Sequence, residues 1–519
     1  MPLHALPLTR HSTYTPFCWE QAEKLGFDAV HFSHHLCHDA HDLLDHPQWA
    51  AEARQWVDDL RQRGREIWVW THELHKVPEE FLNEEGHLLF DEADWAGHLR
   101  RKYQKFLNET IPGITGLIFT FAETDFEIYK DHNVVSRHAP AERLRLLMEV
   151  LVDICRENGV RVAVRDFVYR LKEVHAMAEA IRILPKEVAV MSKAVPHDWQ
   201  PFYPPNPLLG ACGDREQWAE FDLGLEYEGQ QMLPYANLEQ TQAWYQAARA
   251  KGIRHFCLRL DRYDGEKGQS ALTTPWGQLF VSMFRAWEED PKTSLEDIYR
   301  TWEKDHFPGA AEAVQLATTS LQKMLFPKKN WLANHCAIPF YKYAKSHLVD
   351  GNADRLAMWT DAPEDHEIEK NLRHLPRAFR LELEEEAREA QAIFTKAHDL
   401  LAKNLPPTHP AADRWQDGFR MLGSYLRLLE AYRKAFFMVR ESEENPEKAE
   451  SKEEIEKAIE AFEHTGSEEA PLWADRCFTR FNGRQLYQRW VYDPKNPEAI
   501  PVKTLFHPVA ASLRKIIQT

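Results

Sequence analysis

The strongest constraint on the fold is the regular alternation of short apolar segments with amphipathic helical segments over residues 1–290. Apolar runs separated by helices indicate a parallel sheet that is covered on both faces. Eight such units predict an α/β fold of the (β/α)8 TIM barrel type, in which chemistry takes place where the strands end. The eight predicted strands are residues 3–8, 27–33, 66–71, 113–121, 160–169, 188–193, 218–227 and 254–260.

The strand pattern fades beyond residue 290, and helical periodicity takes its place. Helices are expected at residues 294–305, 365–404, 411–440 and 451–464. Within the barrel region, Pro140 begins a clear amphipathic helix and Asn158-Gly159 ends it. We therefore expect a catalytic barrel at residues 1–290, followed by a C-terminal all-α domain at residues 291–519.

The composition argues against several classes of function. A net charge of −17 is unfavourable for nucleic-acid binding, which needs a basic surface. No apolar run reaches the roughly 20 residues that cross a bilayer, and no signal-peptide pattern is found at the N-terminus. Seven cysteines without tight spacing are typical of free thiols, so a cytoplasmic location is expected. GxGxxG, Walker and GxSxG motifs are absent, and we expect no cofactor.

Three carboxylates lie at or just beyond the ends of predicted strands. Glu123 follows the fourth strand, Asp198 follows the sixth, and Glu226 ends the seventh. Cleavage of a glycosidic bond needs one protonated carboxyl group and one carboxylate on opposite sides of the bond. Glu123 is the expected acid, because the apolar strand before it would raise its pKa by desolvation. Asp198 or Glu226 is the expected base, and the alternative for each residue is a salt bridge or a helix cap.

Other polar side chains near strand ends are candidates for substrate binding. Arg165 places a cation in an otherwise apolar strand, and its alternative role is a buried ion pair with Asp166 or another nearby carboxylate. Lys193 and Trp199 flank Asp198 and would offer a hydrogen-bond donor and a stacking face.

Histidine-rich segments follow the second and third predicted strands, in HFSHHLCHDAH and THELHK. His34, His72 and Glu73 are predicted to bind sugar hydroxyls, with plain surface histidines as the alternative. The spacing HELH differs from the HExxH of zinc enzymes, so no metal site is expected. Asp261 and Arg262 follow the last strand and are predicted to border the pocket.

Several segments together resemble the α-glucuronidases of glycoside hydrolase family 67. The segments are KAVPHDWQP, PNPLLGA, EFDLGLEYEGQ, VRDFVY and TPWGQLFVSMFRAWEEDPKTSLEDIYRTWEKDHF. The resemblance implies a (β/α)8 enzyme in which Glu123 is the general acid and Asp198 with Glu226 activates the attacking water. It also implies a substrate-binding role for Arg165. The family has a β-rich domain before its barrel, and it has a lysine at the position of Phe119.

These observations together predict an exo-acting, inverting glycoside hydrolase that removes a terminal sugar, such as glucuronate, from an oligosaccharide. Membrane and nucleic acid are not expected partners, and a homodimer is compatible with the sequence. Two alternatives stay open at this point. One is a metal-dependent barrel enzyme that uses the histidine loops, and the other is a carbohydrate-binding relative without catalysis.

Overall fold

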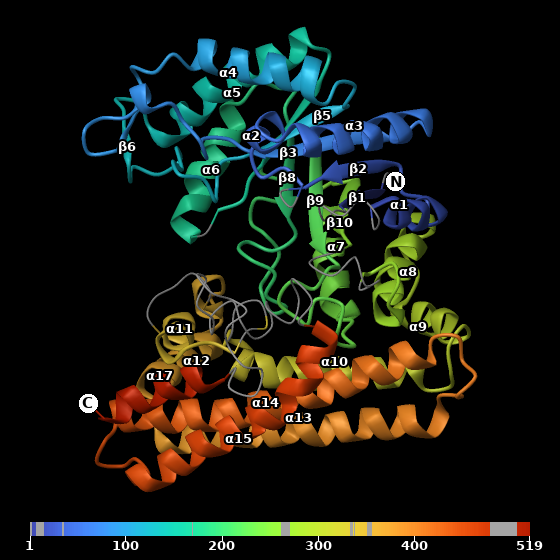
Figure 1. Ribbon diagram of the computed structural model, residues 1–519, viewed down its shortest axis with the longest axis vertical. Coiled ribbons are helices and arrows are strands. Elements are labelled where there is room, and N and C mark those ends of the chain that lie inside the picture. Colours follow the sequence, from blue (N-terminus) through green and yellow to red (C-terminus); the bar gives the residue numbers. More distant parts are fainter. Residues whose placement is uncertain are drawn as a thin grey trace. The chain divides into compact units, whose positions relative to one another are not determined.

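The chain forms two compact units, which we call the barrel unit and the helical unit (Figure 1). The barrel unit consists of Met1–Asp198, Pro204–Leu223 and Thr241–Asp261, and the helical unit consists of Trp199–Tyr203, Gly224–Gln240 and Arg262–Thr519. The computed structural model describes residues 3–6, 15–33, 36–168, 170–260, 270–332, 336, 338–349, 355–477 and 506–518.

Eight parallel strands close into a barrel, in the order β1-β10-β9-β8-β7-β5-β3-β2. Each of them overlaps one predicted strand, so the predicted fold class is confirmed. The strands are β1 (Leu3–Leu6), β2 (Ala29–Phe32), β3 (Glu66–His72), β5 (Gly116–Thr120), β7 (Arg161–Arg165), β8 (Ala189–Lys193), β9 (Gln217–Asp222) and β10 (His255–Arg259). A separate parallel pair is formed by β4 (Leu88–Leu89) and β6 (Val134–Val135).

Large aromatic side chains fill the barrel interior. The buried cluster at its centre consists of Ala29, Trp68, Trp70, Ile118, Ala163, Ala189, Met191, Trp218 and Cys257. Trp68 meets Trp218 edge to face, with ring centroids 4.7 Å apart. A β-carbon on Gly116 would lie 2.2 Å from Cζ3 of Trp68, so this position has room only for glycine. Side chains alternate between the two faces of a strand, so every second residue of each strand enters this core.

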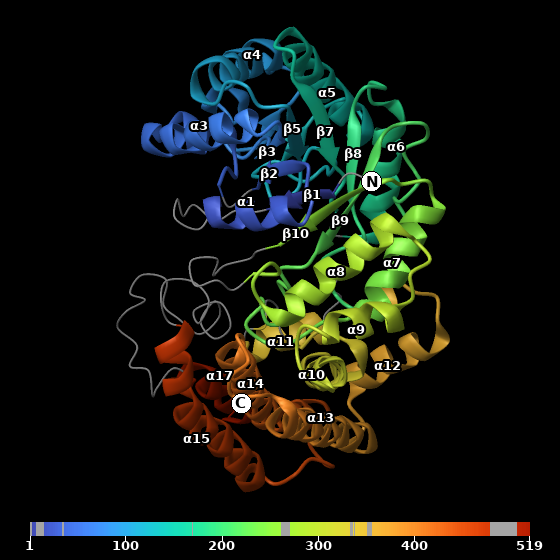
Figure 2. The same ribbon diagram turned by 90° about the vertical axis from the view of Figure 1, so that its right-hand side faces the viewer.

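Helices surround the strands of the barrel unit (Figure 2). They are α1 (Thr15–Lys24), α2 (Ala40–Leu44), α3 (Pro47–Gln62), α4 (Trp95–Lys105), α5 (Pro140–Glu157), α6 (Leu171–Ile183) and most of α7 (Leu238–Ala250). The predicted helix at Pro140 is confirmed as α5, with proline in its first turn and a buried apolar face. The connection from β8 to β9 contains no helix, and its turns at residues 194–216 include Asp198.

The helical unit contains long antiparallel helices, of which α13 packs against α10 and α14, and α14 packs against α15. Its helices are α8 (Pro275–Glu289), α9 (Leu295–Glu303), α10 (Ala310–Leu325), α11 (Tyr341–Leu348), α12 (Pro363–His374), α13 (Arg377–Asn404), α14 (Ala412–Glu444), α15 (Lys452–Cys477) and α17 (His507–Gln518). The prediction of one helix at residues 365–404 is wrong. Leu375 has a φ of 39° and precedes Pro376, which ends α12 there because proline disfavours helical geometry in the preceding residue.

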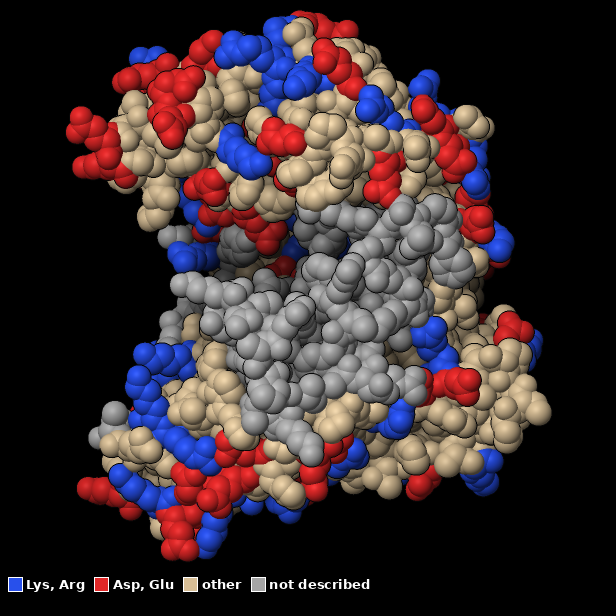
Figure 3. All heavy atoms as spheres, in the orientation of Figure 1, with Lys and Arg blue, Asp and Glu red and all other residues tan. Residues whose placement is uncertain are grey.

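Acidic and basic side chains are interspersed over the described surface of both units on the face drawn in Figure 3. None of the described helices combines the length and the apolar character that a membrane crossing requires.

Candidate active site

Charged side chains replace the apolar core at the C-terminal ends of four neighbouring strands. Arg165, Lys193, Glu220 and Arg259 each lie two residues after a member of the central cluster, on β7, β8, β9 and β10 respectively. A spacing of two residues keeps a side chain on the same face of a strand, so all four enter the barrel interior. All four are buried. The C-terminal end of a barrel is also where enzymes with this fold place their active sites.

Arg165 and Glu220 form the central ion pair of this layer. Nε of Arg165 donates to Oε2 of Glu220 at 2.8 Å, and Nη2 donates to Oε1 at 3.2 Å. Nε of Arg259 lies 3.8 Å from the same Oε1. The guanidinium of Arg165 also lies 4.9 Å from the ring centroid of Trp70 and 5.0 Å from that of Phe167. Arg165 is thereby held in one orientation by two hydrogen bonds and two aromatic faces.

The predicted alternative partner of Arg165, Asp166, directly follows β7 and has other partners. Oδ2 of Asp166 accepts a hydrogen bond from the Ser192 hydroxyl at 2.5 Å, and Ser192 accepts one from Nε2 of Gln217 at 2.7 Å. Gln217 also donates to the backbone carbonyl of Leu208 at 3.0 Å, which anchors the loop that contains Asp198. Burial raises the pKa of Asp166 to about 7.

Lys193 and Asp198 form a second ion pair, with Nζ and Oδ1 2.5 Å apart. Lys193 is buried, while the Asp198 side chain keeps 20% of its surface exposed. Burial lowers the pKa of Lys193, an effect that Asp198 opposes and Arg165 reinforces. Nζ also lies 3.8 Å from the ring centroid of Phe167. Lys193 therefore fixes the position of the Asp198 side chain, part of which stays accessible.

Glu123 lies three residues beyond β5 and has a φ of 59°, in the left-handed region. Non-glycine residues in this region store strain, which is frequent at functional sites. The side chain is 45% exposed, and its Oε2 lies 3.6 Å from Nε2 of His72. Crowding by protein atoms raises the pKa of Glu123, but His72, Arg165 and Lys193 outweigh it and hold this pKa well below its usual range. The expectation of a raised pKa is therefore wrong for the protein without ligand.

His72 ends β3 and is fully buried. Its Nδ1 lies 2.9 Å from the backbone oxygen of His38, and the two rings stack with centroids 4.1 Å apart. Burial, and then the charges of His72 and His75, lower the pKa of His38 to about 4. His75 lies at the edge of the His38 ring, 4.7 Å between centroids, and its Nδ1 is 3.7 Å from Oδ1 of Asp125.

Glu73 is engaged in a buried cluster behind β3. Nζ of Lys102 lies 3.1 Å from both of its carboxylate oxygens, and the Tyr103 hydroxyl donates to Oε2. Lys102 also donates to Asp39 at 2.8 Å. Both oxygens of Glu73 are thus used within the protein, where they fix the loop that follows β3.

The remaining predicted residues divide into two groups. Glu226 and Trp199 are buried residues of the helical unit, and Glu226 lies in a turn beyond the end of β9. His34, Asp261 and Arg262 lie outside the described residues. No group of histidine, cysteine or acidic side chains in the described part of the chain is arranged to hold a metal ion.

Glu220 and Arg259 were not among the predicted residues. The signal for Glu220 is the segment Trp218-Ala-Glu220, which places a carboxylate on the inward face of an apolar strand. The same spacing from Cys257 identifies Arg259.

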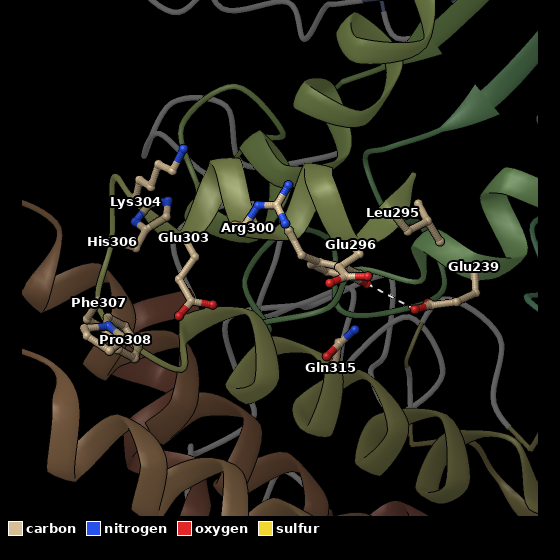
Figure 4. A pocket seen from close by; sticks show the side chains of 11 residues that line it. Glu239, Leu295, Glu296, Arg300, Glu303, Lys304, His306, Phe307, Pro308 and Gln315 are labelled. Atoms are coloured by element: carbon tan, nitrogen blue, oxygen red, sulfur yellow. Dashed lines mark hydrogen bonds between the residues drawn. The ribbon is translucent and has the colours of Figure 1, made fainter. Parts of the chain in front are cut away.

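A surface pocket of about 760 Å³ also opens in the helical unit, between α9 and the beginnings of α7 and α10 (Figure 4). Two of its acidic side chains have partners within the fold. Glu239 accepts a hydrogen bond from the Tyr299 hydroxyl at 3.4 Å, and Glu303 accepts one from the backbone N–H of Gly309 at 2.6 Å. None of the residues that line this pocket is a buried cation or an acidic residue with left-handed backbone geometry, whereas the barrel end has both. The barrel end is therefore the stronger candidate.

Comparison with known proteins gives similarity in structure but not in sequence. No family model and no curated protein sequence matches the chain. A family GH138 enzyme targeting pectin rhamnogalacturonan II is similar with a TM-score of 0.55 and 11% identity, over 91% of this chain and 62% of that one. A family GH115 4-O-methyl-α-glucuronidase with specificity for decorated arabinogalactans has a TM-score of 0.50 and 11% identity, over 97% and 61%.

The chain thus spans about three fifths of the length of these two glycoside hydrolases. At this level of identity the similarity establishes a shared fold. Neither of the two is a family 67 enzyme, the family that the sequence motifs resemble.

Proposed function

We propose that the protein is a glycoside hydrolase that removes a terminal uronic acid from an oligosaccharide. The observation that carries this proposal is the charge arrangement at the C-terminal end of the barrel. Three buried cations, Arg165, Lys193 and Arg259, lie there with the carboxylates of Glu220 and Asp198. Two glycoside hydrolases with similar folds, one of them an α-glucuronidase, add support.

The charge balance favours an anionic sugar. When the general acid carries its proton, the three cations have ion-pair contacts, within the described part of the chain, with the two carboxylates Glu220 and Asp198. A uronate would supply the third negative charge, and cations in a water-poor site bind a carboxylate more strongly than they do in water. Position 119 on β5 is occupied by an uncharged phenylalanine, which packs edge to face against Tyr103 with centroids 5.5 Å apart. The three cations are instead supplied by β7, β8 and β10.

The roles of the carboxylates follow from their surroundings. Glu123 is the proposed acid, because it combines an exposed side chain with a strained backbone at the end of β5. It would donate a proton to the glycosidic oxygen as the bond to the anomeric carbon breaks. Asp198, whose Oδ1 lies 2.5 Å from Nζ of Lys193, would accept a proton from the attacking water. Direct attack by water would invert the anomeric centre and would require about 6.5–9.5 Å between acid and base.

The proposal is tested with aryl glucuronides and uronic-acid oligosaccharides, and with neutral oligosaccharides for comparison. Loss of a general acid costs about 10²–10⁴-fold in rate for a poor leaving group but little for an activated one. Glu123→Gln should therefore retain activity only on activated aryl glucuronides, whereas Asp198→Asn should lose activity on both kinds. Asp125→Asn is the matched control, because Asp125 is an exposed carboxylate two residues beyond Glu123.

Product analysis decides between the remaining outcomes. Proton NMR of the first product formed would show the opposite anomer to the substrate if the reaction inverts. Release of a neutral sugar alone would contradict the uronate specificity. Binding of oligosaccharides without any product would contradict catalysis and identify a carbohydrate-binding protein.

A further inference from the structure

The ring of His72 lies between two oxygen atoms, one of the backbone and one of a carboxylate. Nδ1 lies 2.9 Å from the backbone oxygen of His38, and Nε2 lies 3.6 Å from Oε2 of Glu123. A backbone carbonyl can only accept, so Nδ1 carries a hydrogen in this contact. In neutral His72 the other nitrogen, Nε2, therefore presents a lone pair toward the carboxylate of Glu123.

Two lone pairs facing each other beside a fully buried ring repel. A proton on Nε2 converts the same contact into an attraction between a cationic ring and a carboxylate. We propose that His72 and Glu123 share one proton at neutral pH, and that this proton is delivered to the leaving oxygen of the substrate. The delivery step rests on the proposed function, whereas the shared proton rests on the geometry alone.

The neighbouring groups support this arrangement. His38 stacks on His72 and has its pKa lowered to about 4 by burial and by the charges of His72 and His75, so His38 stays neutral. Its stacked ring and its backbone carbonyl hold the plane of His72. Arg165 and Lys193 favour the ionised form of Glu123, so the proton lies nearer to His72 when no substrate is bound. Asp125 faces His75 instead.

The shared proton moves to the glycosidic oxygen, and the electrons of the breaking bond to the anomeric carbon stay on that oxygen. Neutral His72, with its hydrogen on Nδ1, and the carboxylate of Glu123 remain. The base takes a proton from the attacking water and later releases it to solvent, from which the pair is protonated again. His72 thus acts through Glu123 and is a positioning residue.

Nitrogen NMR of the full chain labelled with ¹⁵N-histidine tests the shared proton without any substrate. At neutral pH, both ring nitrogens of His72 should carry hydrogens in the wild type. In Glu123→Gln only Nδ1 should do so, and the missing signals of His72→Gln provide the assignment. A wild-type His72 with an unprotonated Nε2 at neutral pH would overturn the proposal, whatever the protein hydrolyses.

Kinetics test the delivery step. His72→Gln should reduce kcat about 10- to 100-fold for poor leaving groups, with little change for activated aryl glucuronides, and should move the alkaline limb of the pH profile to lower pH. His75→Gln, the same substitution on the same loop, should alter neither quantity. An equal loss for both leaving groups would mean that His72 is merely structural and would overturn this step. If the wild type hydrolyses no glycoside, the proposed function fails and the NMR result alone decides the shared proton.

Discussion

Replacement of Glu220 by glutamine should destabilise the barrel unit strongly. Glu220 is fully buried, and its oxygens face Arg165 at 2.8 and 3.2 Å and Arg259 at 3.8 Å. Glutamine keeps the shape and one acceptor but removes the negative charge. Two buried guanidinium groups would then lack the charge that compensates their desolvation.

The magnitude follows from the geometry of the pair. With about 4 Å between charge centres and an effective dielectric constant near 20, one ion pair is worth about 4 kcal/mol. Removal of one partner from a buried pair typically costs about 3–5 kcal/mol. We therefore expect the free energy of unfolding to fall by about 3–5 kcal/mol. The hydrogen bond that glutamine keeps lowers this cost, and the loss of the weaker contact with Arg259 raises it.

Hydrogen exchange measured by mass spectrometry on peptides that contain β7 and β9 reports on the barrel unit separately from the helical unit. Exchange there should accelerate in Glu220→Gln, and adding Arg165→Met should recover part of the protection, because the unpaired cation is gone. Glu157→Gln is the control, since Glu157 forms an exposed ion pair with Arg100 between α5 and α4. The reasoning is refuted if Glu220→Gln exchanges like the wild type, or if the double variant is less stable than Glu220→Gln.

Three further substitutions test other parts of the barrel unit. Burial raises the pKa of Asp166 to about 7, above its unfolded value near 4, so the wild type should lose stability as the pH rises between these values. Asp166→Asn should remove that dependence, and denaturation midpoints that run parallel over this pH window would contradict it. Gly116→Ala should lower the melting temperature, with a cost of about 1–3 kcal/mol or more, because its β-carbon would overlap Trp68; an unchanged thermal transition would contradict it. Lys102→Met should cost about 3–5 kcal/mol, because it leaves Glu73 and a second buried carboxylate uncompensated, and a urea midpoint equal to that of the wild type would count against this.

The candidate site could be predicted in part from the sequence. Arg165, Lys193 and Asp198 were recognisable as polar residues at the ends of apolar strands, because burial pattern and strand length are local properties. The partner of Arg165 was not, since Glu220 follows it by 55 positions along the chain. The neighbouring Asp166 was the nearer choice in sequence, but it directly follows β7 and has other partners.

The pKa of Glu123 shows the same limit more clearly. The apolar residues before it suggested desolvation and a raised pKa. Its actual direction is set by His72, Arg165 and Lys193, which three other strands contribute. Electrostatic effects depend on distances in space, and no local pattern contains those distances.

The sequence by itself determined the class of fold, the eight strands and the end of the barrel at which polar residues gather. It could do so because apolar runs and helical periodicity report the secondary structure and burial of each segment independently of the others. Only the tertiary structure decided which charges meet there. The register between neighbouring parallel strands places Lys193 beside Glu220 and Thr120 beside Arg165, and this register arises when the barrel closes around its tryptophan core.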